Sequence, residues 1–178
     1  MKHLFMLLLA AAALTVVGCK EDDDTTPVTP TPTDPIVGTW VSEGANVPLG
    51  LRVAPFKVVK ITATFNANKS YTVVQIDSAN VTTTYTGTYT NMESTSKDTV
   101  SSSTTKDATI YNIVANQATP TVVTSTGIYA IKSTNMSYEI IQTSPALGVN
   151  PPTPAAGFGS TSVGTTKYPI YIQKYVKQ

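Results

Sequence analysis

Apolar and polar residues alternate one by one along much of the chain after position 36, and this period of two is typical of strands that bury one face. The clearest example runs from Val59 to Phe65, where every second residue is apolar and the residues between are Lys or Thr. Residues 66–69 (NANK) then predict a turn, and the segment from Tyr71 to Ile76 predicts the returning strand. We therefore expect a β-hairpin over residues 59–76.

Tyrosines and threonines alternate in the next segment, residues 81–90. The face that carries Tyr85 and Tyr89 is expected to lie against the core, and the face that carries only threonines is expected to lie in water. Gly87 interrupts the aromatic face, which predicts a bend or a close approach of another backbone, as a barrel strand requires. A second Gly-x-Tyr unit, ending at Tyr129, repeats this pattern further along the chain.

Eight segments with strand patterning predict an all-β domain. They are residues 37–42, 59–65, 71–76, 81–90, 109–115, 122–132, 137–143 and 167–176. The mostly short connections favour an eight-stranded antiparallel up-and-down barrel, because closure removes exposed strand edges; a β-sandwich is the alternative. No stretch of ten or more residues after position 19 has a helical period. Residues 91–107 are expected to form a mobile loop or a long exposed hairpin end, and residues 144–165, rich in Pro and Gly, a second loop.

The N-terminal segment has the pattern of an export signal. A short basic start is followed by an apolar run from Leu4 to Val17, which is shorter than the roughly 20 residues that a membrane-spanning helix needs. The run ends in Val16-Val17-Gly18-Cys19, which resembles the lipobox of bacterial lipoproteins. The resemblance implies that residues 1–18 are a lipoprotein signal peptide and that Cys19 becomes the lipidated N-terminus, for example by palmitate; an ordinary signal peptide is the alternative.

The residues after Cys19 indicate where in the cell the protein is expected to be located. The run KEDDD at 20–24 resembles the signal that directs lipoproteins of the Bacteroidota to the outer face of the outer membrane, although a solvated start to a linker is the alternative. Residues 25–35 (TTPVTPTPTDP) predict a stiff stalk, because proline favours an extended chain that reaches roughly 35 Å over this length. We therefore assign residues 19–35 to the anchor and stalk and residues 36–178 to the folded domain. Thr25 and Thr99 match the Asp-Ser/Thr-apolar pattern of O-glycosylation in the same group.

The charge balance and the small number of reactive side chains argue against several classes of function. The chain has 12 Lys and Arg against 11 Asp and Glu, which argues against a nucleic-acid partner. The only His, His3, lies in the signal peptide, and the only Cys is the lipidation site. Without imidazole or thiol, we predict no catalytic residue, no metal ligand and no cofactor, and expect the protein not to be an enzyme. A glycosidase that draws two carboxylates from distant strands remains the enzymatic alternative.

The first predicted strand opens with Gly38-Thr39-Trp40, which resembles the G-x-W motif of lipocalins. The layout that follows resembles the lipocalin-like domains of Bacteroidota lipoproteins. This resemblance implies a barrel that Trp40 closes at one end and whose interior holds one small apolar molecule. Aromatic residues predicted to point inward are the candidate ligand-binding residues: Phe65, Tyr85, Tyr89 and Tyr129.

Two hypotheses follow for the domain. The first is a surface-anchored outer-membrane lipoprotein that binds a small apolar molecule in its barrel. The second is a structural or interaction lipoprotein with a filled core, whose outer tyrosines could stack on a surface glycan. In either case, we expect a monomer whose membrane contact is the N-terminal lipid. An interior cavity of a few hundred Å³ would favour the first hypothesis.

Overall fold

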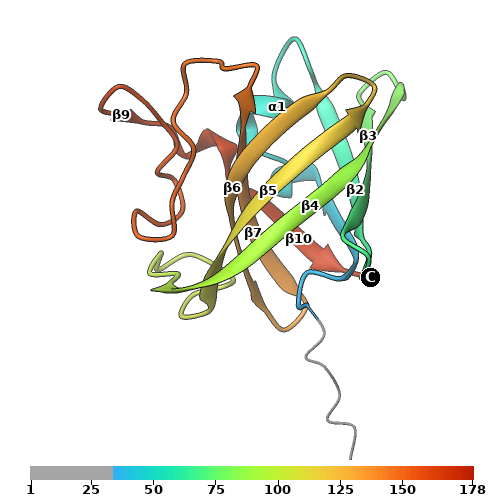
Figure 1. Ribbon diagram of the computed structural model, residues 1–178. Coiled ribbons are helices and arrows are strands. Elements are labelled where there is room, and N and C mark those ends of the chain that lie inside the picture. The colour runs from blue at the N-terminus through green and yellow to red at the C-terminus, as the bar shows by residue number, and fades with distance from the viewer. Residues whose placement is uncertain (1–33) are drawn as a thin grey trace, which may run out of the picture. The chain divides into compact units, whose positions relative to one another are not determined.

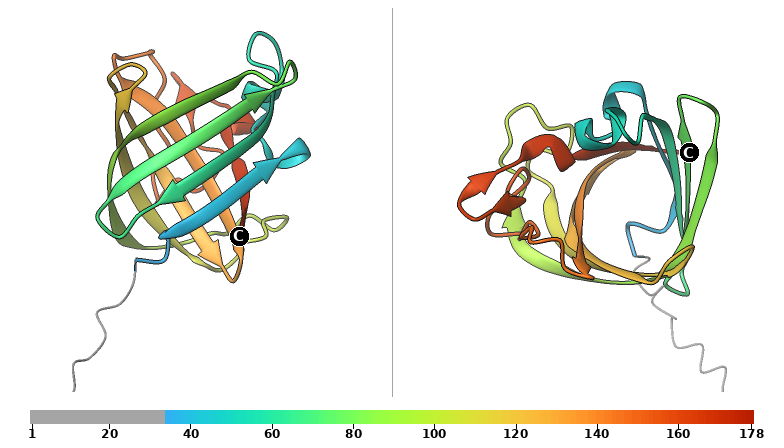
Figure 2. Two further views of the ribbon diagram at one scale, coloured as in Figure 1. Left: turned by 90° about the vertical axis from the view of Figure 1, so that its right-hand side faces the viewer. Right: turned by 90° about the horizontal axis from the view of Figure 1, so that it is seen from above.

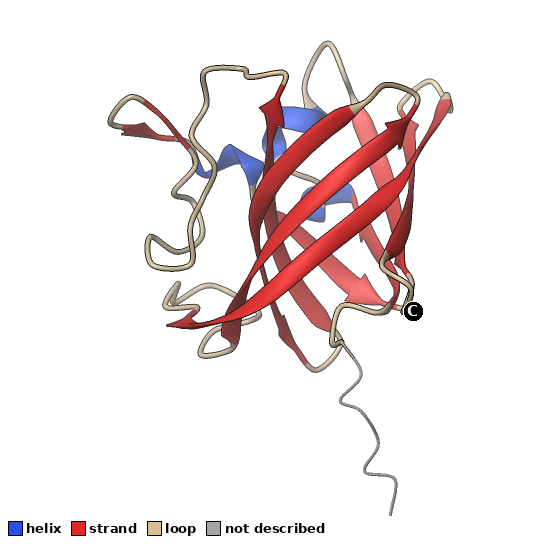
Figure 3. Ribbon diagram, in the orientation of Figure 1, coloured by secondary structure: helices blue, strands red, loops and turns tan. Residues whose placement is uncertain are grey.

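The computed structural model describes residues 34–178, which form an all-β domain (Figures 1 and 3). The predicted signal peptide, the predicted lipidation site Cys19, the acidic run and Thr25 lie outside the described residues. Eight strands form a closed antiparallel barrel. These strands are β1 (Gly38–Glu43), β2 (Val58–Phe65), β3 (Ser70–Asp77), β4 (Thr82–Lys97), β5 (Thr109–Thr119), β6 (Val123–Lys132), β7 (Asn135–Ser144) and β10 (Gln173–Lys177). The predicted fold class is confirmed.

Each strand from β1 to β6 pairs with the next strand along the chain, and β10 closes the ring between β7 and β1. Figure 2 shows this ring from above, with the segment between β7 and β10 lying outside it. Because one ring holds all eight strands, the alternative of a β-sandwich is wrong. The helical elements in residues 34–178 are all short: η1 (Gly44–Asn46), α1 (Leu49–Arg52) and η2 (Pro169–Tyr171).

A β-bulge at the start of β2 changes the predicted pattern there. The pairing with β3 shifts between Val58 and Lys60. Val58 is therefore buried and Val59 is 43% exposed, although the alternation predicts Val59 on the core face. From Ile61 onward the predicted alternation holds. A bulge adds one residue to one strand, so the side chains on one side of the bulge point to the opposite face from the one that strict alternation predicts.

Two glycines allow neighbouring strands to approach closely, as predicted for Gly87. A Cβ at Gly87 would lie 2.1 Å from the backbone oxygen of Asn116 in β5. A Cβ at Gly127 in β6 would lie 2.1 Å from the backbone oxygen of Glu139 in β7. No residue with a side chain fits at that distance, so the repeated Gly-x-Tyr units mark two places where the backbones of neighbouring strands approach closely.

The hairpin of β4 and β5 is longer than predicted, because β4 continues to Lys97. Of the two expectations for residues 91–107, the long hairpin end is the one found. Its tip is fixed by the buried Asp98, which accepts hydrogen bonds from the Thr105 hydroxyl at 2.7 Å and the Val100 N–H at 3.0 Å. Thr99, the candidate glycosylation residue, is exposed beside it.

The segment between β7 and β10 folds against the outside of the barrel. It includes the small hairpin of β8 (Ser162–Val163) and β9 (Thr166–Lys167). The fully buried carboxylate of Glu139 holds it, accepting hydrogen bonds from the N–H groups of Gly159 at 2.6 Å and Thr161 at 3.1 Å and from the Thr161 hydroxyl at 2.5 Å. The last barrel strand starts at Gln173, later than predicted, because the chain forms η2 from Pro169 to Tyr171 first.

Candidate ligand-binding cavity

A cavity of about 320 Å³ lies inside the barrel. It lies toward the end that carries α1 and the connections 78–81 and 120–122, which we call the open end. The residues that line it are Leu51, Ile61, Phe65, Tyr71, Val73, Gln75, Tyr85, Ala115, Gln117, Ser125, Tyr138, Ile140, Gln173 and Tyr175. Seven strands and α1 contribute to this lining.

The lining combines apolar surface with the uncharged polar groups of Gln, Ser and Tyr side chains, and it includes no Asp, Glu, Lys or Arg. Gln75, Gln117 and Ser125 lie near the open end and are half-buried, so solvent reaches this part of the cavity. The Gln117 amide donates to the backbone oxygen of Thr121 at 2.8 Å. Such a site suits a molecule that is mostly apolar and carries a small number of hydrogen-bonding groups.

The tyrosines deeper in the cavity are uncharged as well. Burial raises the pKa of Tyr71, of Tyr138 and of Tyr175, so each phenol keeps its proton at neutral pH and well above it. A phenol in this state orients a ligand by donating or accepting a hydrogen bond.

The structure places two of the four candidate ligand-binding residues in the cavity and two outside it. Phe65 and Tyr85 line it. Tyr89 and Tyr129 do not; both are buried further toward the other end of the barrel. Phe65 separates the cavity from this packed region, because its ring meets that of Tyr89 edge to face, with centroids 5.2 Å apart.

The end opposite the cavity is closed by packed side chains around Trp40. The Trp40 side chain is fully buried, and its indole N–H donates to the backbone oxygen of Ile36 at 2.7 Å. The ammonium of Lys177, the last residue of β10, lies 5.1 Å from the centre of the Trp40 ring. The structure thus places Trp40 in the closed end, where it lines no part of the cavity.

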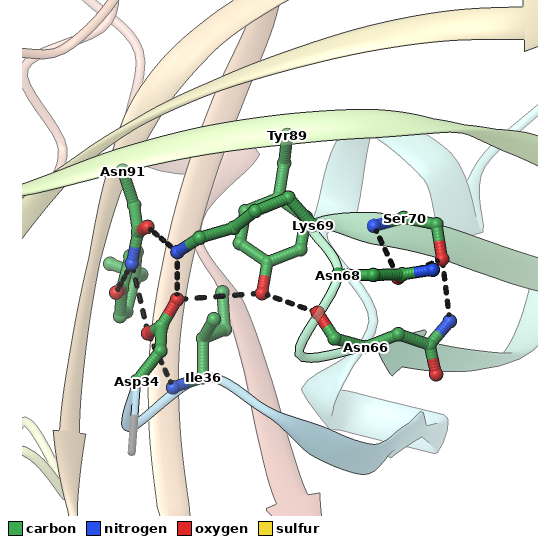
Figure 4. Close-up of polar contacts among 9 residues, drawn as sticks. Asp34, Ile36, Asn66, Asn68, Lys69, Ser70, Tyr89 and Asn91 are labelled. Carbon is green, nitrogen blue, oxygen red and sulfur yellow. Dashed lines mark hydrogen bonds and ion pairs between the residues drawn. The ribbon is translucent and has the colours of Figure 1, made fainter. Parts of the chain in front are cut away.

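A polar network centred on Asp34 also lies at the closed end (Figure 4). The Asp34 carboxylate accepts hydrogen bonds from the Lys69 ammonium at 2.6 Å, the Asn91 amide at 2.9 Å and the Ile36 N–H at 3.2 Å. The Lys69 ammonium also donates to Asn91 Oδ1 at 2.7 Å. The network joins the start of the described chain to the β2–β3 turn and to β4.

This network sets the protonation of its members. Burial acts to raise the pKa of Asp34, but hydrogen bonds from Lys69, Ile36 and Asn91, with the Lys69 charge, outweigh it, and the pKa is lowered overall. Burial and the neighbouring Asp34 carboxylate raise the pKa of Tyr89 to about 12. Burial also raises the pKa of Tyr129, whose hydroxyl accepts a hydrogen bond from the Asn91 amide at 2.6 Å. The two tyrosines therefore serve the closed end as neutral hydrogen-bonding groups.

Sequence reasoning missed several cavity residues and Asp34. Tyr138 and Tyr175 lie on predicted strands. The alternation of Tyr138 with polar neighbours was an available signal, whereas Tyr175 is followed by the apolar Val176 and shows no clear alternation. Leu51 lies on α1, which is only four residues long and therefore too short to show a helical pattern in the sequence. Asp34 was assigned to the stalk, because nothing in a Pro-rich sequence indicates an ion pair with a residue 35 positions away.

Within residues 34–178, no group of three or more His, Cys, Asp or Glu side chains is arranged so that it could hold a metal ion. In the same residues, no helix is long and apolar enough to span a membrane. Comparison with protein-family models, with curated proteins and with solved structures finds no match for this chain. The closed eight-stranded antiparallel barrel is consistent with a lipocalin-like fold.

Proposed function

We propose that this protein is a lipid-anchored lipoprotein of the outer-membrane surface whose barrel binds a small, neutral, mostly apolar molecule. The cavity of about 320 Å³ is the observation that carries the binding role. Its size falls within the range of roughly 300–1,000 Å³ that is usual for small-molecule sites. A barrel of eight strands can fill its interior with side chains or hold one small ligand, and a cavity of this size favours the second case over a filled core.

The cavity chemistry supports a neutral ligand. No cationic or anionic side chain lines it, so a charged group that left water for this site would lose its hydration without gaining a partner. The resemblance of Gly38-Thr39-Trp40 to the lipocalin G-x-W motif supports the same function, and Trp40 is fully buried and lines no part of the cavity.

Binding can be tested with a neutral fluorescent probe, N-phenyl-1-naphthylamine, and the mature chain 19–178 carrying Cys19→Ala. We expect its fluorescence to rise on binding. Val73→Trp places a large side chain in the cavity lining and should weaken binding at least tenfold. Val176→Trp is the matched control, since Val176 is 41% exposed and lines no part of the cavity. Equal binding by both variants, or no binding by the parent chain, would argue against the barrel as a binding site.

Lipid anchoring at Cys19 needs its own experiment in the native cells. Cys19→Ala should abolish incorporation of labelled palmitate and leave an unprocessed precursor or a soluble protein, because acylation requires the thiol. Replacing residues 21–24 by Ala should leave acylation intact and protect the protein from protease added to whole cells. A Cys19→Ala chain that is still acylated and still fractionates with membranes would disprove the anchor. Glycosylation of Thr25 and of the exposed Thr99 belongs to the same proposal.

A further inference from the structure

The barrel wall is incomplete on one side of the cavity. β7 pairs with β10 only from Asn135 to Tyr138, where Tyr138 lies opposite Gln173. β7 continues to Ser144, and no other described strand pairs with it on that side. The short elements α1 and η2 lie next to each other in this region, with Gly50 close to Tyr171.

A second cavity, of about 220 Å³, lies along this free edge of β7. Ile140 and Gln142 line it from one face of the strand, and Ile141 lines it from the other. Successive side chains of a strand point to opposite faces, so contact with neighbouring residues of both faces fits a cavity that lies along the unpaired edge of the strand. Leu147 and Val149 of the following segment complete its outer side.

The two cavities are neighbours that share four lining residues. These residues are Leu51, Tyr138, Ile140 and Gln173. A single layer of side chains therefore divides the barrel cavity from the second cavity. No backbone pairing crosses this layer, because the strand ladder between β7 and β10 ends at Tyr138 and Gln173.

The dividing layer contains a buried polar group without a partner. Gln173 is 6% exposed, and its Nε2 makes no hydrogen bond of good geometry among the described residues. The side chain lies close enough to the Tyr175 hydroxyl to lower the pKa of that group, so this hydroxyl serves the amide only in part. A buried amide donor without a partner is costly, so such a group in a native structure requires an explanation. A ligand oxygen at the passage between the cavities would supply the missing acceptor.

We propose that the two cavities form one elongated site that takes a neutral amphiphile with an alkyl chain, its polar oxygen near Gln173 and its length divided between the barrel and the side cavity. This proposal rests on the proposed function and specifies its ligand class. Neither lining contains Asp, Glu, Lys or Arg, so an alcohol or ester is favoured over a carboxylate of the same length. The second cavity takes the part of the chain that the barrel cavity cannot hold.

The experiment measures competition of n-alkanols from six to twelve carbons against N-phenyl-1-naphthylamine on the mature chain with Cys19→Ala. Each added CH₂ that finds an apolar site should strengthen binding roughly fourfold. In the parent chain, this gain should continue through the longer alkanols. Dodecanoate at pH 8 should bind at least tenfold more weakly than dodecanol, and equal binding would overturn the neutral ligand class.

Two variants test the second cavity by itself. Val149→Trp fills it, and Leu147→Glu places a charge on it at a residue that is 61% exposed, where we expect little effect on the fold. Both variants should bind hexanol as the parent does, but their affinity should stop rising with alkanol length for the longest alkanols. Val163→Trp, outside both cavities, is the matched control and should behave like the parent.

The outcomes separate the two proposals. If Val149→Trp and Leu147→Glu follow the parent at every chain length, the elongated site is disproved while the barrel site stands. If Val73→Trp leaves hexanol binding unchanged, or if no alkanol competes with the probe, the barrel site fails, and the elongated site fails with it.

Discussion

Replacing Trp40 by alanine should lower the free energy of unfolding by about 3–5 kcal/mol, as truncation of large aromatic side chains in cores does. The side chain is fully buried, and its indole N–H bonds the Ile36 backbone, so the change leaves both a void and an acceptor without its donor. A domain of this size has about 5–15 kcal/mol of stability in total. We expect a clear fall in the melting temperature measured by circular dichroism.

The same residue gives an optical check, because Trp40 is the only Trp of the chain. Its emission should be blue-shifted and poorly quenched by iodide in the native protein. Tyr168→Ala is a suitable control for aromatic truncation, since Tyr168 is 37% exposed, and it should cost far less stability. A readily quenched Trp40 whose removal leaves the melting temperature unchanged would contradict its place in the closed end.

Replacing Asp34 by alanine should cost about 2 kcal/mol at neutral pH, in the range for hydrogen bonds to charged groups. The carboxylate accepts from Lys69, Asn91 and the Ile36 N–H, and the loss leaves these donors without their shared acceptor. Urea denaturation of the parent and the variant at a series of pH values measures this difference.

The pH dependence follows from the direction of the Asp34 pKa. The pKa is lowered in the folded state below its ordinary value of 3.8, so the unfolded chain takes up the proton first as the pH falls. The stability that Asp34 contributes is therefore complete above about pH 5 and declines as the pH falls through 3.8 and then through the folded pKa.

The surface ion pair of Glu43 with Lys60 provides the control for Asp34. The Lys60 ammonium and the Glu43 carboxylate are 3.5 Å apart, and their side chains are 42% and 64% exposed, so Glu43→Gln should cost less than about 1 kcal/mol. An Asp34→Ala variant that is no less stable than Glu43→Gln, or whose deficit persists unchanged at pH 2, would refute the stabilising role of the network.

The strand content and the barrel were predictable because alternation survives in nearly every strand. Threonine-rich outer faces and tyrosine-bearing inner faces gave β4 its orientation, and Gly87 indicated the close approach that the structure contains. Val59 was placed on the wrong face because the bulge beside it leaves no mark in the sequence.

The candidate site was only partly predictable, because periodicity gives the face of a residue and not its depth along the barrel. Tyr85 and Tyr89 share one face of β4, yet only Tyr85 lines the cavity. Depth depends on the tilt of each strand and on its register with strands far away in the sequence. The side cavity was beyond sequence reasoning for a further reason: it exists because pairing of β7 with β10 stops early.

The position of β10 has a consequence for how the barrel forms. β2 to β7 can assemble as successive hairpins from neighbouring stretches of chain, whereas β1 and β10 come from opposite ends of the described residues and pair at only two positions, Trp40 with Lys177 and Val41 with Val176. Contacts between distant segments carry the largest loop-closure entropy and form slowly. Until β10 arrives, the edges of β1 and β7 are open and can pair with another chain. The protein is therefore most exposed to aggregation during folding, before this seam has closed.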